Sequence, residues 1–327
     1  MTGKNLIYFI QQIESVISHY YLKYSNEKNS LIIFLFHGLF QNKKEISLNI
    51  VDPQQGIVID HFHQFVKYFL KYNYKFVSPY DILNGLTKNK KYLMITFDDG
   101  YYNNINALPI LKKYKIPATF FISTNNVKYN KCFWWDVLYK EHIKLGCSLK
   151  DIKLERNRLK TKANDEIEKY LIENFGKDSF SPIGDIDRPF TPSELKDFSN
   201  EDFVFLGNHA CDHAILSNYS SQEIKSQLLN AQKYLKNITG KSPIIISYPN
   251  GNYTKEIIKI SKESGCKLGL TLDRKKNKLP IEYKNDRHMC LGRFYFEGNN
   301  NLIKQFELIR SDIVISHKIL DFVNKGY

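Results

Sequence analysis

The sequence lacks the features of a disulfide-stabilised or membrane-spanning protein. Its five cysteines are odd in number and include no CxxC pair, so a disulfide framework is not indicated. No segment reaches the roughly 18 uninterrupted apolar residues of a transmembrane helix. The apolar run at residues 6–10 is too short for a signal-peptide core, and no small-residue cleavage site follows it. These absences predict a cytoplasmic protein, free in solution or at the inner face of the membrane.

Acidic residues are fewer than basic ones, 34 against 47, which gives a net charge of +13. The lysine clusters at residues 88–91 and 275–278 are short, and a lysine-rich composition accounts for most of the excess. The other interpretation is a surface that meets anionic partners, including peripheral contact with an anionic membrane surface. No basic stripe or stacking motif supports a nucleic-acid binder.

Apolar segments of strand type alternate with segments of helical periodicity along the chain. We expect strands at residues 31–36, 76–77, 92–97, 118–122, 203–206, 244–246 and 268–272. Helices are expected between them, for example at residues 59–72, 221–238 and 254–264. This order predicts an α/β fold with a parallel sheet, open or closed, in one barrel-sized domain.

Three parts of the chain depart from this alternation. Residues 128–200 are less regular and are predicted to be a helical insertion between two β/α units. In residues 1–30, Ile10, Ile13, Val16 and Ile17 recur at helical spacing, which predicts an amphipathic helix that docks on the body or, alternatively, lies on a membrane. Residues 31–296 would form the barrel, and residues 297–327 a helical tail.

Four predicted strands end in polar or conformationally special residues. These ends are His37, the run Asp98-Asp99-Gly100, the segment 207–213 and the segment 248–251. Functional groups of parallel β/α folds gather at the carboxyl ends of the strands, so we expect these residues to share one face.

Two histidines and one carboxylate in these segments could hold a metal ion. His209 and His213 are four residues apart, which on one helical turn places both imidazoles on the same side. If one of Asp98 and Asp99 binds the metal, the other can act as a base on water, with Gly100 permitting a sharp turn. The alternatives are a packed and a solvated histidine, and a simple turn with an aspartate cap.

The segments "TFDDGYYNN", "GNHACDH" and "SYPNGNYT" resemble the polysaccharide deacetylases of carbohydrate esterase family 4, the NodB-homology group. The resemblance covers about residues 31–296. It implies a distorted (β/α) barrel with one divalent metal, zinc by preference and cobalt, nickel or manganese as alternatives. It also implies hydrolysis of an N-acetyl group on an amino sugar.

Residue roles follow from the same resemblance. Asp99, His209 and His213 would bind the metal, and Asp98 would be the catalytic base. A backbone N–H near the strand end at Tyr248, Pro249 and Asn250 would help to hold the oxyanion.

The sequence departs from the family pattern in its supporting residues. Ala210 stands where a serine or threonine usually follows the first histidine, which removes a supporting hydrogen bond. The arginine that usually contacts the base is missing near Ser247. Arg293 or Arg188 could replace it, unless each forms an ion pair elsewhere.

The general acid of the family, in a late Leu-x-His motif, has no match. His288 and His317 lie in other contexts, so His37 is preferred as a site-lining residue. Aromatic residues could stack on sugar rings or pack in the core; these are Tyr101, Tyr102, Trp134, Trp135 and Tyr253.

The expected substrate is a carbohydrate, and a lipid- or nucleotide-linked sugar precursor of the cell envelope fits better than finished polymer. Two alternatives remain open. One is a deformylase or cyclic-imide amidohydrolase on the same scaffold, and the other is a catalytically impaired sugar-binding relative.

Overall fold

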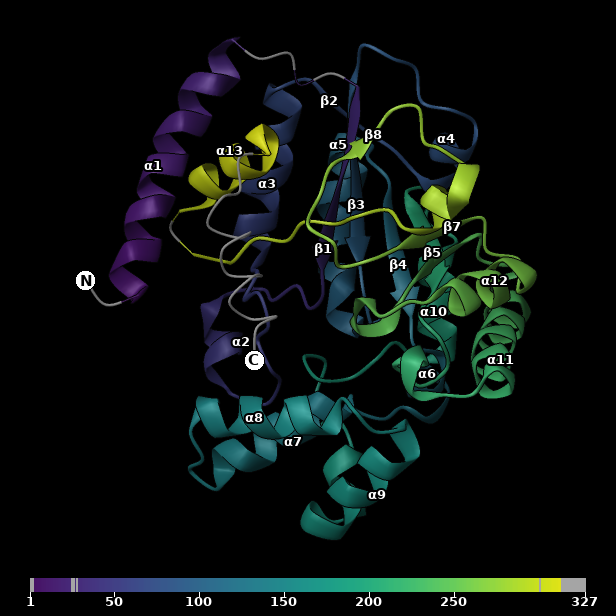
Figure 1. The fold of residues 1–327 in the computed structure, drawn as a ribbon. Helices are drawn as coiled ribbons and strands as arrows, with labels where there is room; N and C mark the ends of the chain where they lie inside the picture. Colours follow the sequence, from purple (N-terminus) through teal and green to yellow (C-terminus); the bar gives the residue numbers. More distant parts are fainter. Residues whose placement is uncertain (1–2, 25–26, 28, 300, 313–327) are drawn as a thin grey trace.

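The computed structural model describes residues 3–24, 27, 29–299 and 301–312, and an eight-stranded sheet lies at its centre (Figure 1). The strand order is β7-β6-β5-β4-β3-β1-β8, with β2 paired to β3. All pairings are parallel except that of β8 with β1. The strands are β1 Ser30–Phe36, β2 Tyr74–Phe76, β3 Lys91–Phe97, β4 Ala118–Ile122, β5 Val204–Asn208, β6 Ile245–Ser247, β7 Leu268–Leu270 and β8 Asn277–Lys278.

A short extended segment, residues 291–294, connects the two sides of the sheet. It bridges β7 through Leu270 and Leu291, and β1 through Phe34 and Phe294, both in parallel register. The N–H of Leu35 donates to the carbonyl of Phe294 at 2.8 Å. The sheet therefore curls into a distorted barrel, and the predicted fold class is confirmed.

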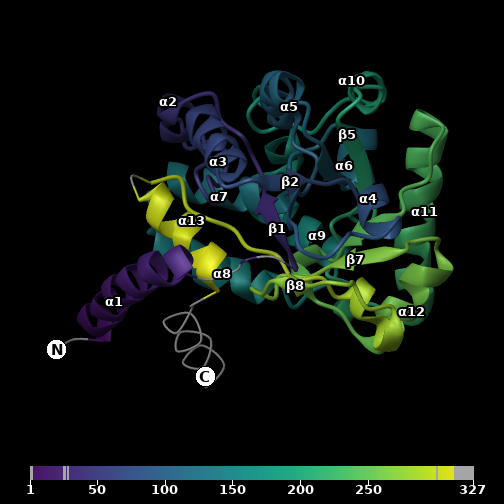
Figure 2. The ribbon, with the colours of Figure 1, turned by 90° about the horizontal axis from the view of Figure 1, so that it is seen from above.

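Helices form an outer layer around the strands (Figure 2). One of them, α3 (Ile59–Lys71), turns Phe62, Phe65 and Phe69 towards the core, where they contact phenylalanines of β1. The sequence encodes this helix by apolar residues at spacings of three and four. The other helices of this layer are α2 Lys43–Ser47, α4 Pro79–Leu83, α5 Leu108–Tyr114, α10 Pro192–Ser199, α11 Ser221–Thr239 and α12 Lys255–Glu263.

The predicted helical insertion lies between β4 and β5. Residues 128–200 begin at the end of α6 (Thr124–Tyr129) and contain α7 (Trp134–Lys144), α8 (Leu149–Leu159), α9 (Asn164–Phe175) and α10, and α7 to α9 form a layer below the barrel in Figure 1. Trp134, Trp135 and Leu171 belong to an apolar cluster separate from the main core. The insertion is therefore packed on its own core and lies beside the carboxyl ends of the strands.

The first helix, α1 (Gly3–Tyr24), packs along α13 (Leu302–Ser311), as Figure 1 shows. The contact includes a polar pair, because the hydroxyl groups of Ser18 and Ser311 are buried 2.8 Å apart. Ile13, Val16 and Ile17 are instead 42%, 57% and 45% exposed. The first helix therefore docks on the body as predicted, through α13, while these three apolar residues stay largely exposed.

Two further expectations concern the ends of the chain and the membrane. The predicted tail beyond α13, residues 313–327 with His317, lies outside the described residues. Within the described residues, no helix is long and apolar enough to cross a membrane.

Candidate active site

The two adjacent aspartates lie in a tight turn directly after β3. The N–H of Asp98 donates to the carbonyl of Phe36 on β1 at 2.8 Å, which continues the sheet by one residue. The chain then takes positive φ angles at Asp99 (77°) and Gly100 (92°). A Cβ at Gly100 would meet Ile122 at 3.1 Å, so glycine satisfies both the φ angle and the close packing. The turn lets the two carboxylates point to different partners.

Asp98 is buried and bound to an arginine. Its oxygens accept hydrogen bonds from Nη1 and Nη2 of Arg293 at 2.7 and 2.8 Å, and from Oγ of Ser247 at 2.9 Å. Burial by itself would raise the pKa of Asp98, but the positive charge of Arg293 and the neighbouring His209 lower it below its ordinary range. Asp98 is therefore held as a carboxylate in a buried position.

Arg293 comes from the segment that closes the barrel. Its side chain is 1% exposed, and its Nε donates to the carbonyl of Thr271 at 3.1 Å. Arg188, the other arginine considered from sequence, instead forms ion pairs with Asp185 and Glu194. The structure thus brings Arg293, and not Arg188, to the aspartate pair.

The two histidines follow β5. Nδ1 of His209 donates to the carbonyl of Ser247 at 2.8 Å, which leaves Nε2 as the acceptor nitrogen facing Asp99. Nε2 of His209 and Nε2 of His213 lie 3.4 and 3.6 Å from Oδ1 of Asp99. The three side chains predicted as metal ligands are therefore adjacent in space.

The predicted helical turn between these histidines is wrong. Residues 209–213 form a non-helical turn in which Ala210 and His213 have φ angles of 61° and 50°. Oδ1 of Asn208 accepts the N–H of Ala210 at 2.8 Å, and Oε1 of Gln227 accepts the N–H of Cys211 at 2.9 Å. These two amides support the turn where the family's hydroxyl at position 210 is missing.

The three side chains fit a divalent metal. One ligand atom from each of Asp99, His209 and His213 lies within 4.8 Å of the others. Both carboxylate oxygens of Asp99 and Nε2 of His209 are buried and have no hydrogen-bond partner among the described residues. Burial lowers the pKa of His213 to about 3, so its imidazole is neutral and can bind a cation. Two imidazoles and one carboxylate are a typical donor set for a catalytic metal with open positions.

A cavity of about 340 Å³ opens above Asp98 and Asp99. His37 lines it, and its Nδ1 lies 3.0 Å from Oε1 of Gln55, so Nε2 is the ring nitrogen left for the cavity. Trp135 also lines it, and its ring lies edge-on to the ring of His213, with 4.6 Å between the ring centroids. The predicted site residues are thus joined by side chains of the insertion.

The strand end at β6 supplies backbone groups to this cavity. The N–H of Tyr248 donates to Leu270 at 3.2 Å, and Pro249 has no N–H. The N–H of Asn250 makes no hydrogen bond with another described residue, and Asn250 has a φ angle of 55°. Among the three residues predicted at this strand end, Asn250 is therefore the one with an available amide donor.

The aromatic candidates separate into packing and site-lining residues. Tyr101 is buried, and its hydroxyl donates to Asp136 at 2.7 Å. Trp134 and Trp135 are packing residues and site-lining residues at once, since they are buried and also line the cavity. Tyr102 stacks against the guanidinium of Arg188.

Sequence reasoning missed several polar residues of the cavity wall. Asp52, Arg156 and Lys160 all line it, although two of them come from the insertion. Their only sequence signal is the spacing of four between Arg156 and Lys160. This spacing is common on solvated helices, so it could not indicate a site.

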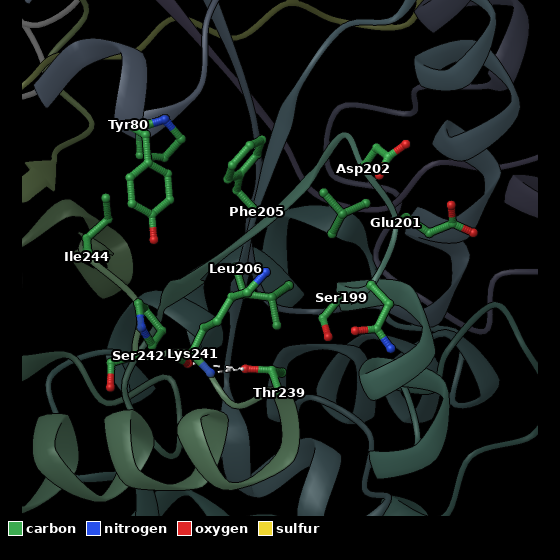
Figure 3. A pocket seen from close by; sticks show the side chains of 14 residues that line it. Tyr80, Ser199, Glu201, Asp202, Phe205, Leu206, Thr239, Lys241, Ser242 and Ile244 are labelled. Atoms are coloured by element: carbon green, nitrogen blue, oxygen red, sulfur yellow. Dashed lines mark hydrogen bonds between the residues drawn. The ribbon is translucent and has the colours of Figure 1, made fainter. Parts of the chain in front are cut away.

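Another cavity, of about 460 Å³, lies at the amino ends of β5 and β6. Figure 3 shows Phe205, Lys241 and Ile244 among the residues that line it. It contains none of the predicted site residues, and it opens at the end of the strands opposite to Asp98.

Comparison with known proteins identifies the family. A model of the family described as polysaccharide deacetylase matches residues 85–269, more than half of the chain. The chain belongs to the polysaccharide deacetylase family. The resemblance to NodB-type members of carbohydrate esterase family 4 is thereby confirmed.

Curated relatives of the family are distant. The Bacillus subtilis polysaccharide deacetylase YxkH is 23% identical over 217 residues, and the match covers 65% of this chain but only 57% of that protein. A poly-beta-1,6-N-acetyl-D-glucosamine N-deacetylase of Staphylococcus aureus is 25% identical over 265 residues. The match covers 79% of this chain and 72% of that enzyme's length.

Solved structures of this family share the fold. Streptococcus pyogenes deacetylase PplD, in complex with acetate, has a TM-score of 0.58 at 18% identity, covering 86% of this chain and 98% of its own. IcaB from Ammonifex degensii has a TM-score of 0.56 at 18% identity, with coverages of 86% and 97%. At these identities the likeness shows that the fold is shared, and the activity has to be argued from the residues of the site.

Proposed function

We propose that this member of the polysaccharide deacetylase family is a metal-dependent hydrolase that removes N-acetyl groups from an N-acetylated amino sugar. The observation that carries the proposal is the arrangement of the two aspartates. Asp98 is held ionised by Arg293, while the carboxylate of Asp99 faces two histidines and has no hydrogen-bond partner among the described residues. Both lie in one cavity at the carboxyl ends of the strands.

Each residue has a place in the proposed reaction. Asp99, His209 and His213 would hold a divalent metal, which when bound would polarise the acetyl carbonyl and make water more acidic. The carboxylate of Asp98 would accept the proton of the attacking water. The N–H of Asn250 would donate to the carbonyl oxygen as negative charge develops on it.

The departing amine needs a proton, for which we propose Nε2 of His37. Its Nδ1 is oriented by Gln55, and the ring lines the same cavity as Asp98 and Asp99. With the acid in this position, the missing Leu-x-His motif does not prevent the reaction.

The carrier of the sugar and a contact with the membrane are also part of the proposal. The acetyl group would be carried by a lipid- or nucleotide-linked sugar. Contact with an anionic membrane surface would use the exposed Ile13, Val16 and Ile17 of α1.

The proposal is tested by acetate release. Purified protein loaded with zinc or cobalt should release acetate from an N-acetylhexosamine conjugate, and a chelator should stop the reaction. N-formyl and cyclic-imide substrates belong in the same screen. If only those substrates are hydrolysed, the amidohydrolase alternative holds, and if none is, the sugar-binding alternative holds.

A further inference from the structure

The insertion adds two positive side chains to the wall of the active-site cavity. Arg156 lies in the last turn of α8, and Lys160 directly follows that helix. The spacing of four residues places both on one side of the helix, and both line the cavity that contains Asp98 and Asp99. Neither residue belongs to the metal cluster or contacts the aspartate pair.

Only one of the two cations is paired with a carboxylate. Arg156 forms an ion pair with Asp52 through Nη1. Nζ of Lys160 is bonded to a neutral group, Oδ1 of Asn250, at 2.8 Å, and has no carboxylate oxygen within 4.0 Å among the described residues. Since Arg156 is paired with Asp52 and Arg293 with Asp98, Lys160 is the cation of this cavity wall that has no carboxylate partner among the described residues.

Both cations also have hydrogen-bonding capacity left over. An ammonium has three donors, and one of those of Lys160 is used by Asn250. Nε of Arg156 is buried without a hydrogen-bond partner among the described residues. Burial and the nearby charge of Arg156 lower the pKa of Lys160, which means that the ammonium is destabilised where it lies. An anion in the cavity would remove that penalty.

The position of these groups is fixed by the surrounding structure. Nδ2 of Asn218 donates to the carbonyl of Lys160 at 2.9 Å, which anchors the end of α8. The N–H of Asp52 donates to Asp136 at 2.9 Å, which fixes the partner of Arg156. The donors are therefore arranged before any ligand binds, which lowers the cost of binding.

We infer that Lys160 and Arg156 form a subsite for an anionic oxygen group on the substrate. The substrate class would then be an acetamido sugar that bears a phosphodiester or a carboxylate near the N-acetyl group. Lys160 would contact the anion through Nζ, and the positive charge of Arg156 would add to the attraction. This inference rests on the proposed function, because it identifies the substrate of the same cavity.

The test compares three substrates that differ in charge. They are a neutral methyl glycoside of N-acetylglucosamine, the same sugar with a methyl phosphodiester at C1, and N-acetylmuramic acid with its carboxylate. We expect kcat/KM for at least one anionic substrate to exceed that for the neutral one by tenfold or more. The substrate that gains shows which anion is recognised. Equal values for all three substrates would overturn the inference and leave the proposed function intact.

Variants assign the effect to the cation. Lys160→Met should reduce the ratio of anionic to neutral kcat/KM to near one, and Lys160→Arg should retain most of it. Lys153→Met removes an exposed charge from the same helix and is the matched control, with an unchanged ratio. An unchanged ratio in Lys160→Met would contradict the inference.

Binding separates this inference from the proposed function. Calorimetric titration with the three sugars needs no turnover. If no substrate is hydrolysed but the anionic sugar binds wild type at least tenfold more tightly than Lys160→Met, the subsite stands and the deacetylase proposal fails. If neither binding nor turnover depends on the anion, the subsite is refuted.

Discussion

Arg293 and Asp98, 195 residues apart in sequence, form two parallel hydrogen bonds at the carboxyl ends of the strands. Both side chains are buried, with exposures of 1% and 5%. A paired guanidinium is the most direct way to keep a carboxylate ionised at such a depth. The pair connects β3 to the segment that closes the barrel, so the fold and the candidate base depend on the same contact.

Loss of this pair should change both activity and its pH dependence. In Arg293→Gln, burial of Asp98 is no longer opposed by the guanidinium, so the pKa of Asp98 should rise. The carboxylate then becomes protonated at a higher pH than in wild type, and the acid side of the kcat/KM profile should move towards neutral pH.

A profile of kcat/KM from pH 4 to 9 measures this shift. Arg188→Gln, which removes an arginine from an ion pair outside the cavity, is the control and should keep the wild-type profile. If the acid side stays in place in Arg293→Gln, Arg293 does not control the ionisation of Asp98.

The two aspartates should differ in what their loss removes. Asp99→Ala and His213→Ala should abolish tight metal binding, because each removes one of three ligands. Asp98→Asn should keep the metal while kcat falls by about 10²–10⁴-fold, the usual contribution of a general base. Metal content after dialysis, measured with kcat, separates the two effects. Equal metal loss in Asp98→Asn would mean that the assigned roles are wrong.

His37 should matter most for substrates with a poor leaving group. In His37→Gln the amine would leave without a donated proton, so kcat on an N-acetyl sugar should fall by about 10²–10³-fold. An acetyl 4-nitroanilide, whose amine leaves more readily, should lose much less. The comparison of the two substrates is the measurement, with His63→Gln, a histidine bonded to Tyr114 outside the cavity, as control. Equal losses on both substrates would contradict an acid role.

The ionisation of Glu27 should make the free energy of unfolding depend on pH in the acid range. Its carboxylate accepts hydrogen bonds from Nε of Arg310 at 2.9 Å and from the hydroxyl of Tyr74 at 2.7 Å. Burial by itself would raise the pKa of Glu27, but these hydrogen bonds and the charge of Arg310 lower it. A lowered folded-state pKa stabilises the protein above the ordinary glutamate pKa, and this contribution is lost as pH falls through the folded value.

Glu27→Gln leaves Arg310 buried without its partner, which should cost about 3–5 kcal/mol of unfolding free energy at neutral pH. The difference from wild type should shrink below about pH 4, where glutamate is protonated in the unfolded chain. Urea denaturation at pH 7 and at about pH 3 measures it. A difference that is independent of pH would exclude a charge effect.

Much of the fold could be predicted because local sequence patterns encode it. The apolar runs at β1, β3 and β4 predicted buried parallel strands, and the helical periodicity of residues 221–238 predicted α11. The exposure of Ile13, Val16 and Ile17 on α1 could not be predicted, because the packing face of this helix depends on α13, almost 300 residues later in the chain.

The sequence by itself determined the strand-end chemistry. Asp98, Asp99, His209 and His213 follow directly from strands whose parallel order places their ends together, so their proximity needs only topology. The tertiary structure decided which arginine meets Asp98, how a turn and not a helix brings the histidines together, and which insertion side chains reach the cavity. These contacts join residues far apart in the chain, and their geometry depends on packing that no local pattern encodes.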